Sequence, residues 1–406
     1  MEERRNVPKL RFPGFTDPWE QRRLGELGSV VMCKRIYKDQ TTERGDVPFF
    51  KIGTFGGEPD AFISNELFEK YQELYSFPKV GDILISAAGT IGRTTVYQGE
   101  RAYFQDSNIV WLDHDDRLDN GFLLQYLNDQ TWSSLEGSTL KRLYNKDILD
   151  ARIALPALDE QQCVGSFFAK LDSLIALHQR ELDHVKELKK GLLQKMFPKE
   201  GTNVPELRFS GFTDPWEQRR LGEIGSARSG VGFPNAEQGG NEGTPFYKVS
   251  DMNLEGNELQ LRRANNYVTD EQIERKRWKP INEVPAMFFA KVGAAVLLNR
   301  KRLVDEPFLL DNNTMAYSFD RQFWDVAFGR ILFDGLDLAS LVQVGALPSY
   351  NASDVESMKV AVPSKIAEQT KIGALFAKLD SLIALHQREL DHVKELKKGL
   401  LQQMFV

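Results

Sequence analysis

Residues 168–197 read FAKLDSLIALHQRELDHVKELKKGLLQKMF, and residues 376–405 repeat this stretch with one change, Gln403 in place of Lys195. Apolar residues recur in it mostly at three- and four-residue intervals, with charged residues between them. This period predicts a helix with a single apolar seam. The whole helix would be roughly 55 Å long, which is more than one small domain needs.

The residues that flank the first copy indicate where its helix begins and ends. Asp159, with Gln162 three residues later, has the pattern of a capping box, so we expect Asp159 to cap the N-terminus. Pro198 would end the helix, because proline cannot continue the hydrogen-bonding ladder.

The apolar seam must be buried, and the chain offers an identical partner helix. Two such helices, each following a globular body, can pair antiparallel and give the molecule a pseudo-two-fold axis. His178 and His386 fall near the seam, where they would form a pH switch, a metal pair or a polar layer that sets the register; we favour the polar layer. The residues expected to pair the helices and dock a partner are Phe168, Leu171, Ile175, Leu182, Val185, Leu192, Phe376, Leu379, Ile383, Leu390, Val393 and Leu400.

A second repeat opens each half of the chain. Residues 6–28 read NVPKLRFPGFTDPWEQRRLGELG, and residues 203–225 read NVPELRFSGFTDPWEQRRLGEIG. The period of about two hundred residues indicates a tandem domain duplication, since solenoid repeats are far shorter. We predict an α+β fold in which two globular mixed α/β domains are joined by two long, coiled-coil-like antiparallel helices. The predicted segments are a first domain at 1–157, a helical spacer at 158–198, a second domain at 199–365 and a second spacer at 366–406.

The bodies between these repeats differ in sequence but share short echoes. Both consist of short β-rich runs separated by Gly, Asn and Asp, which is typical of mixed α/β domains with several strands. We therefore predict one fold with divergent surfaces. The proposed correspondences are 48–52 with 245–249, 79–81 with 291–293, 106–108 with 311–313, and 144–145 with 350–351.

Composition limits the class of protein. The chain has 406 residues and 41% hydrophobic content, enough for two or three ordinary domains. It has no apolar run long enough to span a membrane and no apolar signal core after Met1, so we expect a cytoplasmic protein without a membrane partner. Its two cysteines, Cys33 and Cys163, lack metal-ligand spacing, so we expect neither zinc nor a disulfide. The net charge of −6 means that any DNA binding must rest on local basic patches or on a basic partner.

Motifs for catalysis are incomplete. Asp17-Pro18-Trp19 and its repeat at 214–216 look like the clamp of amino-methyltransferases but lack its second proline, so we expect a turn. Residues 89–94 look like a phosphate loop, but Ala87 and Arg93 stand where a Walker A loop has glycine and lysine. Four of the five histidines belong to the repeated helix. We expect no catalytic residue and no metal site, and hence a non-catalytic protein.

Several of these motifs together resemble the specificity (S) subunit of type I restriction-modification enzymes. They are the Leu-Pro-x-Leu-x-Glu-Gln pattern at 155–161, Lys-Leu-Asp at 170–172, LKKGLLQKMF at 188–197, the opening segment and the run 81–92. The resemblance covers the whole chain. In the second body, 298–302 reads LNRKR where the first has Gly-Thr-Ile-Gly, so the carry-over of DNA contacts is weaker there.

The resemblance implies a mechanism. Two target-recognition domains each read one half of a split double-stranded DNA sequence, and the helices set their separation and dock two methyltransferase (M) subunits. The M subunits carry S-adenosylmethionine and methylate adenine N6, and motor-nuclease (R) subunits, which use ATP and Mg, complete the restriction enzyme. This chain itself would bind no cofactor.

Candidate DNA contacts follow from side-chain chemistry. Lys and Arg suit phosphate or guanine, and Asn suits adenine. Lys141-Arg142 and Arg300-Lys301-Arg302 are the strongest candidates, because they fall in predicted loops. The full set is Lys34, Arg35, Lys51, Thr90, Arg93, Lys141, Arg142, Tyr144 and Asn145 in the first body, and Arg228, Lys248, Arg262, Arg263, Arg300, Lys301, Arg302, Tyr350 and Asn351 in the second.

Two other classes of function compete with this interpretation. A structural adaptor would carry two protein-binding bodies on a helical spacer and would recognise no DNA sequence with any partner. A stand-alone nuclease or methyltransferase would need the cofactor and metal motifs that we do not find.

Overall fold

The computed structural model describes residues 7–132, 142–199, 201–342 and 348–405. Contacts divide the chain into unit 1, Met1–Arg180 with Gln387–Val406, and unit 2, Glu181–His386. Both boundaries fall inside the long helices, so the compact units cut across the four segments expected from the sequence. Within the described ranges, no helix is both long and apolar enough to cross a membrane.

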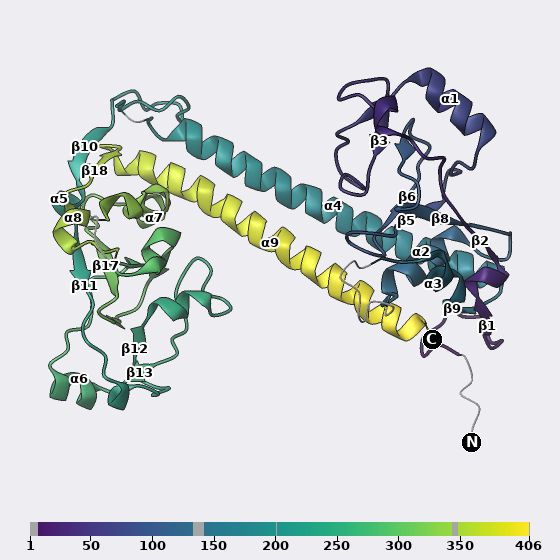
Figure 1. Ribbon diagram of the computed structural model, residues 1–406. Helices are drawn as coiled ribbons and strands as arrows, with labels where there is room; N and C mark the ends of the chain where they lie inside the picture. Colours follow the sequence, from purple (N-terminus) through teal and green to yellow (C-terminus); the bar gives the residue numbers. More distant parts are fainter. Residues whose placement is uncertain (1–6, 133–141, 200, 343–347, 406) are drawn as a thin grey trace. The chain divides into compact units, whose positions relative to one another are not determined.

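The described residues of unit 1 form three small sheets and three short α-helices besides its parts of the long helices (Figure 1). Its four-stranded sheet has the order β2 (Gly28–Val31), β8 (Ile109–His114), β5 (Ile83–Ser86), β6 (Thr94–Val96). A three-stranded sheet has the order β4 (Phe62–Ile63), β3 (Val47–Phe50), β7 (Tyr103–Phe104), and β1 (Glu20–Arg23) pairs with β9 (Arg152–Leu155). The short helices are α1 (Asn65–Leu74), α2 (Asn120–Asp129), α3 (Asn145–Asp150) and the 3₁₀ turns η1 (Leu24–Glu26) and η2 (Lys38–Gln40).

Unit 2 repeats the same strand order. Its sheets are β11 (Gly225–Ser229), β17 (Thr314–Phe319), β14 (Ala286–Ala290), β15 (Lys301–Val304); then β13 (Tyr267–Val268), β12 (Thr244–Tyr247), β16 (Leu309–Leu310); and the pair β10 (Glu217–Arg220), β18 (Lys359–Val362). Its short helices are α5 (Leu221–Ile224), α6 (Asp270–Lys276), α7 (Val326–Gly335), α8 (Ala352–Glu356) and the 3₁₀ turns η3 (Asn235–Glu237), η4 (Val249–Asn253), η5 (Ala294–Leu298) and η6 (Leu338–Leu341). The duplication therefore includes the bodies, as predicted.

Two of the four predicted correspondences between the bodies are confirmed. Residues 48–52 and 245–249 contribute β3 and β12, the central strands of the three-stranded sheets, and each pairs in parallel with its neighbour β7 or β16. Residues 106–108 and 311–313 lie in the matching β7–β8 and β16–β17 connections.

The correspondence of 79–81 with 291–293 is wrong. The first Lys-Val-Gly precedes β5, whereas the second follows β14, which is the strand equivalent to β5 in the sheet order. The apolar run after Gly293 is accordingly the 3₁₀ turn η5 and not a strand. The same tripeptide, Lys-Val-Gly, therefore lies at opposite ends of two equivalent strands.

The correspondence of 144–145 with 350–351 is wrong by one residue. Leu143 N donates to Ala87 O at 2.8 Å, and Tyr350 N donates to Lys291 O at 3.3 Å, so Leu143 and Tyr350 are equivalent. Both are buried. Tyr144, the next residue, is exposed and occupies the N-cap position of α3, as Asn351 does that of α8.

The long helices are α4 (Leu158–Met196) and α9 (Ile366–Met404). The expectation for Asp159 is wrong: it lies inside the first turn, because Glu160 N and Gln161 N already donate to Ala157 O. Pro198 follows the end of α4 by two residues, as expected. All twelve residues expected to pair the helices are buried or half-buried.

Ion pairs fix an antiparallel register within each unit. In unit 1 Lys397 bonds Asp172 at 2.5 Å, and in unit 2 Lys189 bonds Asp380 at the same distance. These are the same repeat positions with the helices exchanged. The histidines follow the same exchange: His178 lies 3.5 Å from Glu389, and His386 lies 3.5 Å from Glu181.

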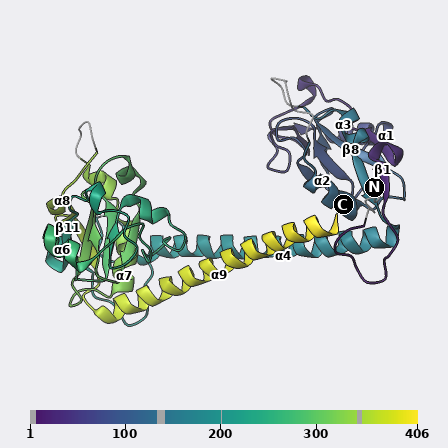
Figure 2. The same cartoon turned by 90° about the horizontal axis from the view of Figure 1, so that it is seen from below.

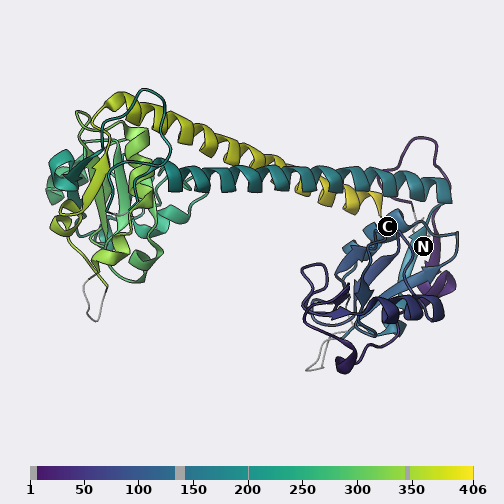
Figure 3. The same cartoon turned by 90° about the horizontal axis from the view of Figure 1, so that it is seen from above.

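The C-terminal end of each long helix completes a body. Figures 1 and 2 show the yellow end of α9 at the body of unit 1, and Figure 3 shows the end of α4 beside the strands of unit 2. Leu401 and Met404 are buried in the core of unit 1, and Met196 is buried in that of unit 2. Burial of these side chains holds the helix ends in place.

The opening segments are held to the long helices by buried charge. Arg11 donates to Glu160 at 2.8 and 2.7 Å, and the Trp19 indole donates to the same carboxylate at 3.2 Å. In unit 2, Glu368 receives the same bonds from Arg208 and Trp216. We call Arg11–Trp19–Glu160 and Arg208–Trp216–Glu368 the two clasps; both carboxylates are almost fully buried.

The glutamine of the Glu-Gln motif positions a helix of the body. Asp119 caps α2 by accepting from Phe122 N at 2.9 Å, and its own N–H donates to Gln161 Oε1 at 2.8 Å. Gly165 allows this close approach, because a Cβ there would lie 2.9 Å from Phe122 N. Unit 2 repeats the arrangement with Asp325 and Gln369.

Candidate nucleic-acid interface

In unit 1 the candidate DNA contacts converge on the connection from β7 to β8. Asp106 accepts from Arg35 at 2.8 Å, and the Ser107 carbonyl accepts from the Arg142 guanidinium at 2.5 Å. Ser107 has a φ of +54°, in the left-handed region. The structure thus brings together two cations that are distant in sequence.

The turn after β5 lies beside this connection and presents Thr90. Ala87 N donates to the Asn108 carbonyl at 2.8 Å, and Ala88 forms a bridge with Arg142. Ser86 closes the turn: its hydroxyl accepts from Arg93 N at 2.9 Å and donates to the Thr90 carbonyl. Thr90 and Arg93 are exposed.

The turn depends on glycine at its two ends. Gly89 has a φ of +65° and Gly92 a φ of +78°. Residues other than glycine rarely adopt a positive φ, so the turn needs both glycines. This is the physical reason for the Gly-x-x-Gly spacing in the first body.

The candidate cations of unit 1 fall into two groups. Arg35 and Lys51 already pair with carboxylates, Asp106 and Asp60, at 2.8 Å each. Arg93 donates to the Gly56 carbonyl at 3.1 Å, Arg142 also donates to a carbonyl, and Lys34 lies 4.8 Å from the Tyr75 ring centroid. In the described part of unit 1, Lys34, Arg93 and Arg142 have no carboxylate partner. Tyr144 and Asn145 are exposed, and Lys141 lies outside the described residues.

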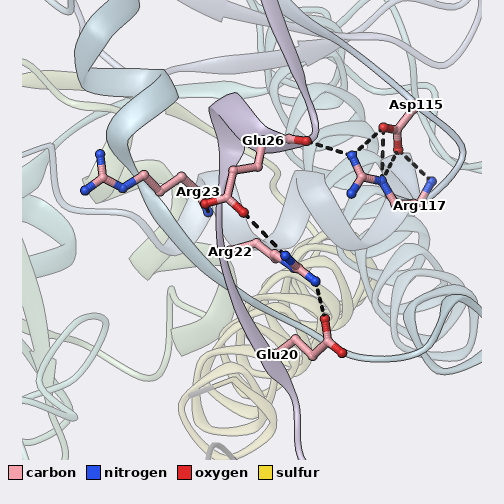
Figure 4. A network of polar contacts seen from close by, with 6 residues as sticks. All are labelled: Glu20, Arg22, Arg23, Glu26, Asp115 and Arg117. Carbon is pink, nitrogen blue, oxygen red and sulfur yellow. Dashed lines mark hydrogen bonds and ion pairs between the residues drawn. The ribbon is translucent and has the colours of Figure 1, made fainter.

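Arginines in and beside the opening segment are also charged, but neighbouring acids pair with them (Figure 4). Arg22 donates to Glu20 at 2.7 Å and lies 3.6 Å from Glu26. Arg117 donates to Asp115 and to the Glu26 carbonyl, both at 2.7 Å. The hydrogen bonds from Arg117 lower the pKa of Asp115 to about 2. The surface around the opening segment is therefore a weaker candidate for phosphate binding than the turn at residues 89–92.

In unit 2 the connection from β14 to β15 takes the place of the Gly-x-x-Gly turn. Lys291 N donates to the Asn313 carbonyl at 2.9 Å, as Ala87 does to Asn108 in unit 1. Val292 forms a bridge with Ser349, as Ala88 does with Arg142. The connection carries η5 and ends at Arg300.

Two candidates in unit 2 are corrected by their burial. Lys301 begins β15 instead of lying in a loop, and only 5% of it is exposed. Its ammonium donates to the Leu336 carbonyl at 2.6 Å, and burial lowers its pKa to about 8. Tyr350 is also 5% exposed, and its hydroxyl donates to the Ala290 carbonyl at 2.6 Å. Neither side chain reaches a surface where DNA could contact it.

The other candidates of unit 2 are exposed or half-buried. Arg228 pairs with Glu283 at 2.9 Å, whereas Arg300 donates to the Asn253 amide oxygen and Lys248 to that of Gln238, both at 2.7 Å. Arg302 lies in β15 and donates to the Asn257 carbonyl at 2.6 Å. The remaining candidates, Arg262, Arg263 and Asn351, are exposed.

The structure also identifies apolar surface that the seam pattern missed. Exposed leucines lie on the long helices of both units; they include Leu174, Leu177 and Leu396 in unit 1, and Leu382, Leu385 and Leu188 in unit 2. Leu188 falls at the interval of the apolar seam and was expected to be buried, so the seam pattern is wrong at this position. The sequence did indicate this surface, because both copies of the repeated helix carry these leucines at the same positions.

The clasps were missed as well. Each joins an arginine of an opening segment to a glutamate at the start of a long helix in the same unit. The opening segments could be recognised as a repeat in the sequence, but only the folded chain shows that each of them contacts the start of a long helix.

Comparison with known proteins agrees with this architecture. Residues 16–187 match the family described as type I restriction modification DNA specificity domain. A Haemophilus influenzae protein, provisionally named type I restriction enzyme specificity subunit S.HindORF215P, is 53% identical over 152 residues, which cover 37% of this chain and 40% of that protein. The type I restriction enzyme MjaVIII specificity subunit of Methanocaldococcus jannaschii is 20% identical and is matched over 97% of this chain and 92% of its own length.

The fold has a solved counterpart. The crystal structure of the type I restriction-modification system S subunit from M. genitalium has a TM-score of 0.66 and 16% identity, and covers 98% of this chain and 99% of that one. It shares the fold. Residues 16–187 thus match a type I restriction modification DNA specificity domain, and the chain as a whole is similar to type I restriction enzyme specificity subunits.

Proposed function

We propose that this chain reads a split double-stranded DNA target, with one body for each half, and directs two methyltransferase subunits to methylate adenine N6 within it. The same complex, with motor-nuclease subunits that use ATP and Mg, would restrict unmodified DNA. The chain itself is non-catalytic, as specificity subunits are. S-adenosylmethionine would be held by the methyltransferase.

One observation carries the proposal. The clasps, the caps at Asp119 and Asp325 and the helix-pairing ion pairs recur position by position in both units, whereas the equivalent turns differ. Unit 1 presents Thr90 after β5, and unit 2 presents η5 after β14. A repeated constant part suits two copies of one partner, and a variable tip suits two different half-sites.

The exposed leucines supply a docking surface for the repeated partner. Leu174 and Leu396 lie beside the Asp172–Lys397 ion pair of unit 1, and Leu382 and Leu188 lie beside the equivalent pair of unit 2. Exposed apolar side chains that recur at the same positions in both units suit two copies of one partner. Each set would receive one methyltransferase subunit.

The acidic total supports a need for that partner. Phosphate neutralisation supplies much of the affinity of DNA-binding proteins, and this chain carries a net charge of −6. Basic surface on the methyltransferase would supply the further phosphate contacts that binding to DNA requires. We expect the chain alone to bind its target weakly; nanomolar binding without a partner at physiological salt would contradict this.

Stoichiometry tests the docking proposal with a matched pair of variants. Native mass spectrometry of the chain with its methyltransferase should give one specificity subunit with two methyltransferase subunits. Replacing Leu174 and Leu177 by Lys should remove one methyltransferase, and replacing Leu382 and Leu385 should remove the other. Exposed Leu74, on α1, is the control. Variants that keep both partners would show that the leucine sets are not the docking surface.

A further inference from the structure

Unit 2 exposes two adjacent leucines at the tip of the β14–β15 connection. Leu297 is 62% exposed and Leu298 is 60% exposed, although both end a turn whose Val296 is buried. An isolated exposed leucine is ordinary on a protein surface, but two neighbours on one projecting turn form a small apolar tip. Burial of this tip against a ligand would remove both side chains from water.

The base of this tip is fixed to the body. Gly293 N donates to the Pro348 carbonyl at 2.9 Å, and Asn299 holds the other side. The Asn299 amide donates to the Leu336 carbonyl at 2.9 Å and accepts from Leu338 N at 3.1 Å. The leucines are therefore presented from a rigid frame, so that little conformational entropy is lost when they bind.

The tip occupies the position that carries the polar Thr90 in unit 1. The bridges at Ala88 and Val292 place the two connections at equivalent points of the two bodies. Arg300 follows the leucines and bonds a neutral amide, so its charge is not balanced by a carboxylate in the described part of unit 2. An apolar tip beside an unbalanced cation matches the edge of a base pair next to a phosphate.

We propose that Leu297 and Leu298 read thymine C5-methyl groups in the DNA half-site of unit 2. The inference rests on the proposed function and adds the chemistry of one reader. The thymine methyl is the apolar group of the major groove, and apolar side chains contact it directly. The half-site of unit 2 must then contain at least one A·T pair facing the tip, whereas Thr90 gives unit 1 a polar reader at the same position.

A thymine-to-uracil exchange tests this without altering the protein. Once the target is known from its methylation, the purified complex with methyltransferase is titrated on duplexes in which uracil replaces thymine in one half-site. Uracil in the half-site of unit 2 should weaken binding about fourfold for each methyl group contacted. A half-site without an A·T pair, or an unchanged affinity on uracil, would overturn the inference.

The variant Leu297→Ala/Leu298→Ala completes a double-mutant cycle. It should bind the thymine and uracil duplexes equally, because its short side chains no longer reach the methyl group, and it should keep its discrimination in the half-site of unit 1. Leu259→Ala, another exposed leucine of unit 2, is the control and should behave as wild type. A variant that retains full sensitivity to uracil, or that loses the methyltransferase instead, would assign the tip to another role.

Failure of the inference and failure of the proposed function give different results. If the wild-type complex binds its target specifically but ignores the thymine methyls, only the inference fails. If the complex recognises no split target, both fail.

Discussion

Phe405 and Trp19 lie edge to face with their ring centroids 6.2 Å apart, although they come from opposite ends of the chain. In unit 2, Phe197 meets Trp216 in the same way at 5.7 Å. Each long helix thus begins against one body and ends in the core of another. This explains why the two copies match along their whole length except at Lys195 and Gln403: the first half of each copy lies in one unit and the second half in the other.

Phe405→Ala should destabilise unit 1 by about 2–4 kcal/mol, because Phe405 also stacks on Phe122 at 5.0 Å and its removal leaves a cavity. Phe197→Ala should do the same in unit 2. Hydrogen exchange resolves the two units, and each variant should raise exchange in its own unit. Exposed Leu396→Ala is the control, with an effect within about 0.5 kcal/mol. Equal exchange in both units for both variants would contradict this division.

Arg11→Met should cost about 3–5 kcal/mol, because it leaves the buried Glu160 carboxylate without its partner. Arg208→Met should match it in unit 2. The double variant Arg11→Met/Glu160→Leu should recover most of this stability, since no buried charge remains. Denaturant unfolding measures all three, with exposed Arg22→Met as the control. A double variant as unstable as the sum of the two single effects would show that the clasp acts through more than charge pairing.

Lys301→Met should leave DNA binding by the assembled complex unchanged and should alter the stability of unit 2. The pKa of Lys301 is about 8 in the fold and 10.5 for a free lysine, so between these values the unfolded chain binds more protons. Stability of wild type relative to the variant should therefore rise as pH rises from 8 to 10.5. Chemical unfolding across this range checks the sign; a flat difference would contradict it.

Arg300→Ala should do the opposite: it should weaken binding of the complex to every DNA, with little effect on stability. Arg300 precedes the buried lysine and is half-buried, and it donates to the Asn253 amide oxygen at 2.7 Å. Because the alanine variant cannot neutralise a phosphate, the salt dependence of its binding should also fall by about one counterion. Unchanged affinity and salt slope would remove Arg300 from the interface.

The two cysteines should differ in reactivity. Burial raises the pKa of Cys33 to about 12, so its thiolate is scarce at neutral pH, whereas Cys163 is exposed on α4. A thiol reagent should label one cysteine in the native chain and both after unfolding. Cys163→Ser should abolish native labelling; rapid labelling of the native Cys163→Ser chain would contradict the burial of Cys33.

The repeated elements of this fold could be predicted from the sequence. The position of a short motif relative to a strand, and the face on which a strand residue lies, could not. The seam period of α4 and α9 predicted the burial of the twelve pairing residues, but not the exposure of Leu188. The match of 79–81 with 291–293 misled, because a short motif cannot show whether it precedes or follows a strand. The prediction for Lys301 failed for a related reason. A basic triplet suggests a loop, but Lys301 and Arg302 lie in β15, where successive side chains point to opposite faces of the sheet, and Lys301 is buried. The clasp between Arg11 and Glu160 required the fold, since side-chain pairing across so long a separation leaves no local pattern.

The chemistry of the candidate interface was harder to predict than its place. Arg93 and Arg142 were identified from residue type, but the hydrogen bond from Arg142 to the Ser107 carbonyl is visible only in the folded chain. Leu297 and Leu298 were passed over as part of an apolar run. A leucine pair gives the same signal in a strand and at an exposed tip, so only the folded chain separates the two.

The central claim is that one chain reads two half-sites for a repeated methyltransferase. The most direct measurement is to co-express the chain with its methyltransferase and to map N6-methyladenine across the host genome. The account predicts methylation at a single split motif, with two short defined halves and a constant gap. An active, stable complex that methylates an undivided motif, or none, would contradict it.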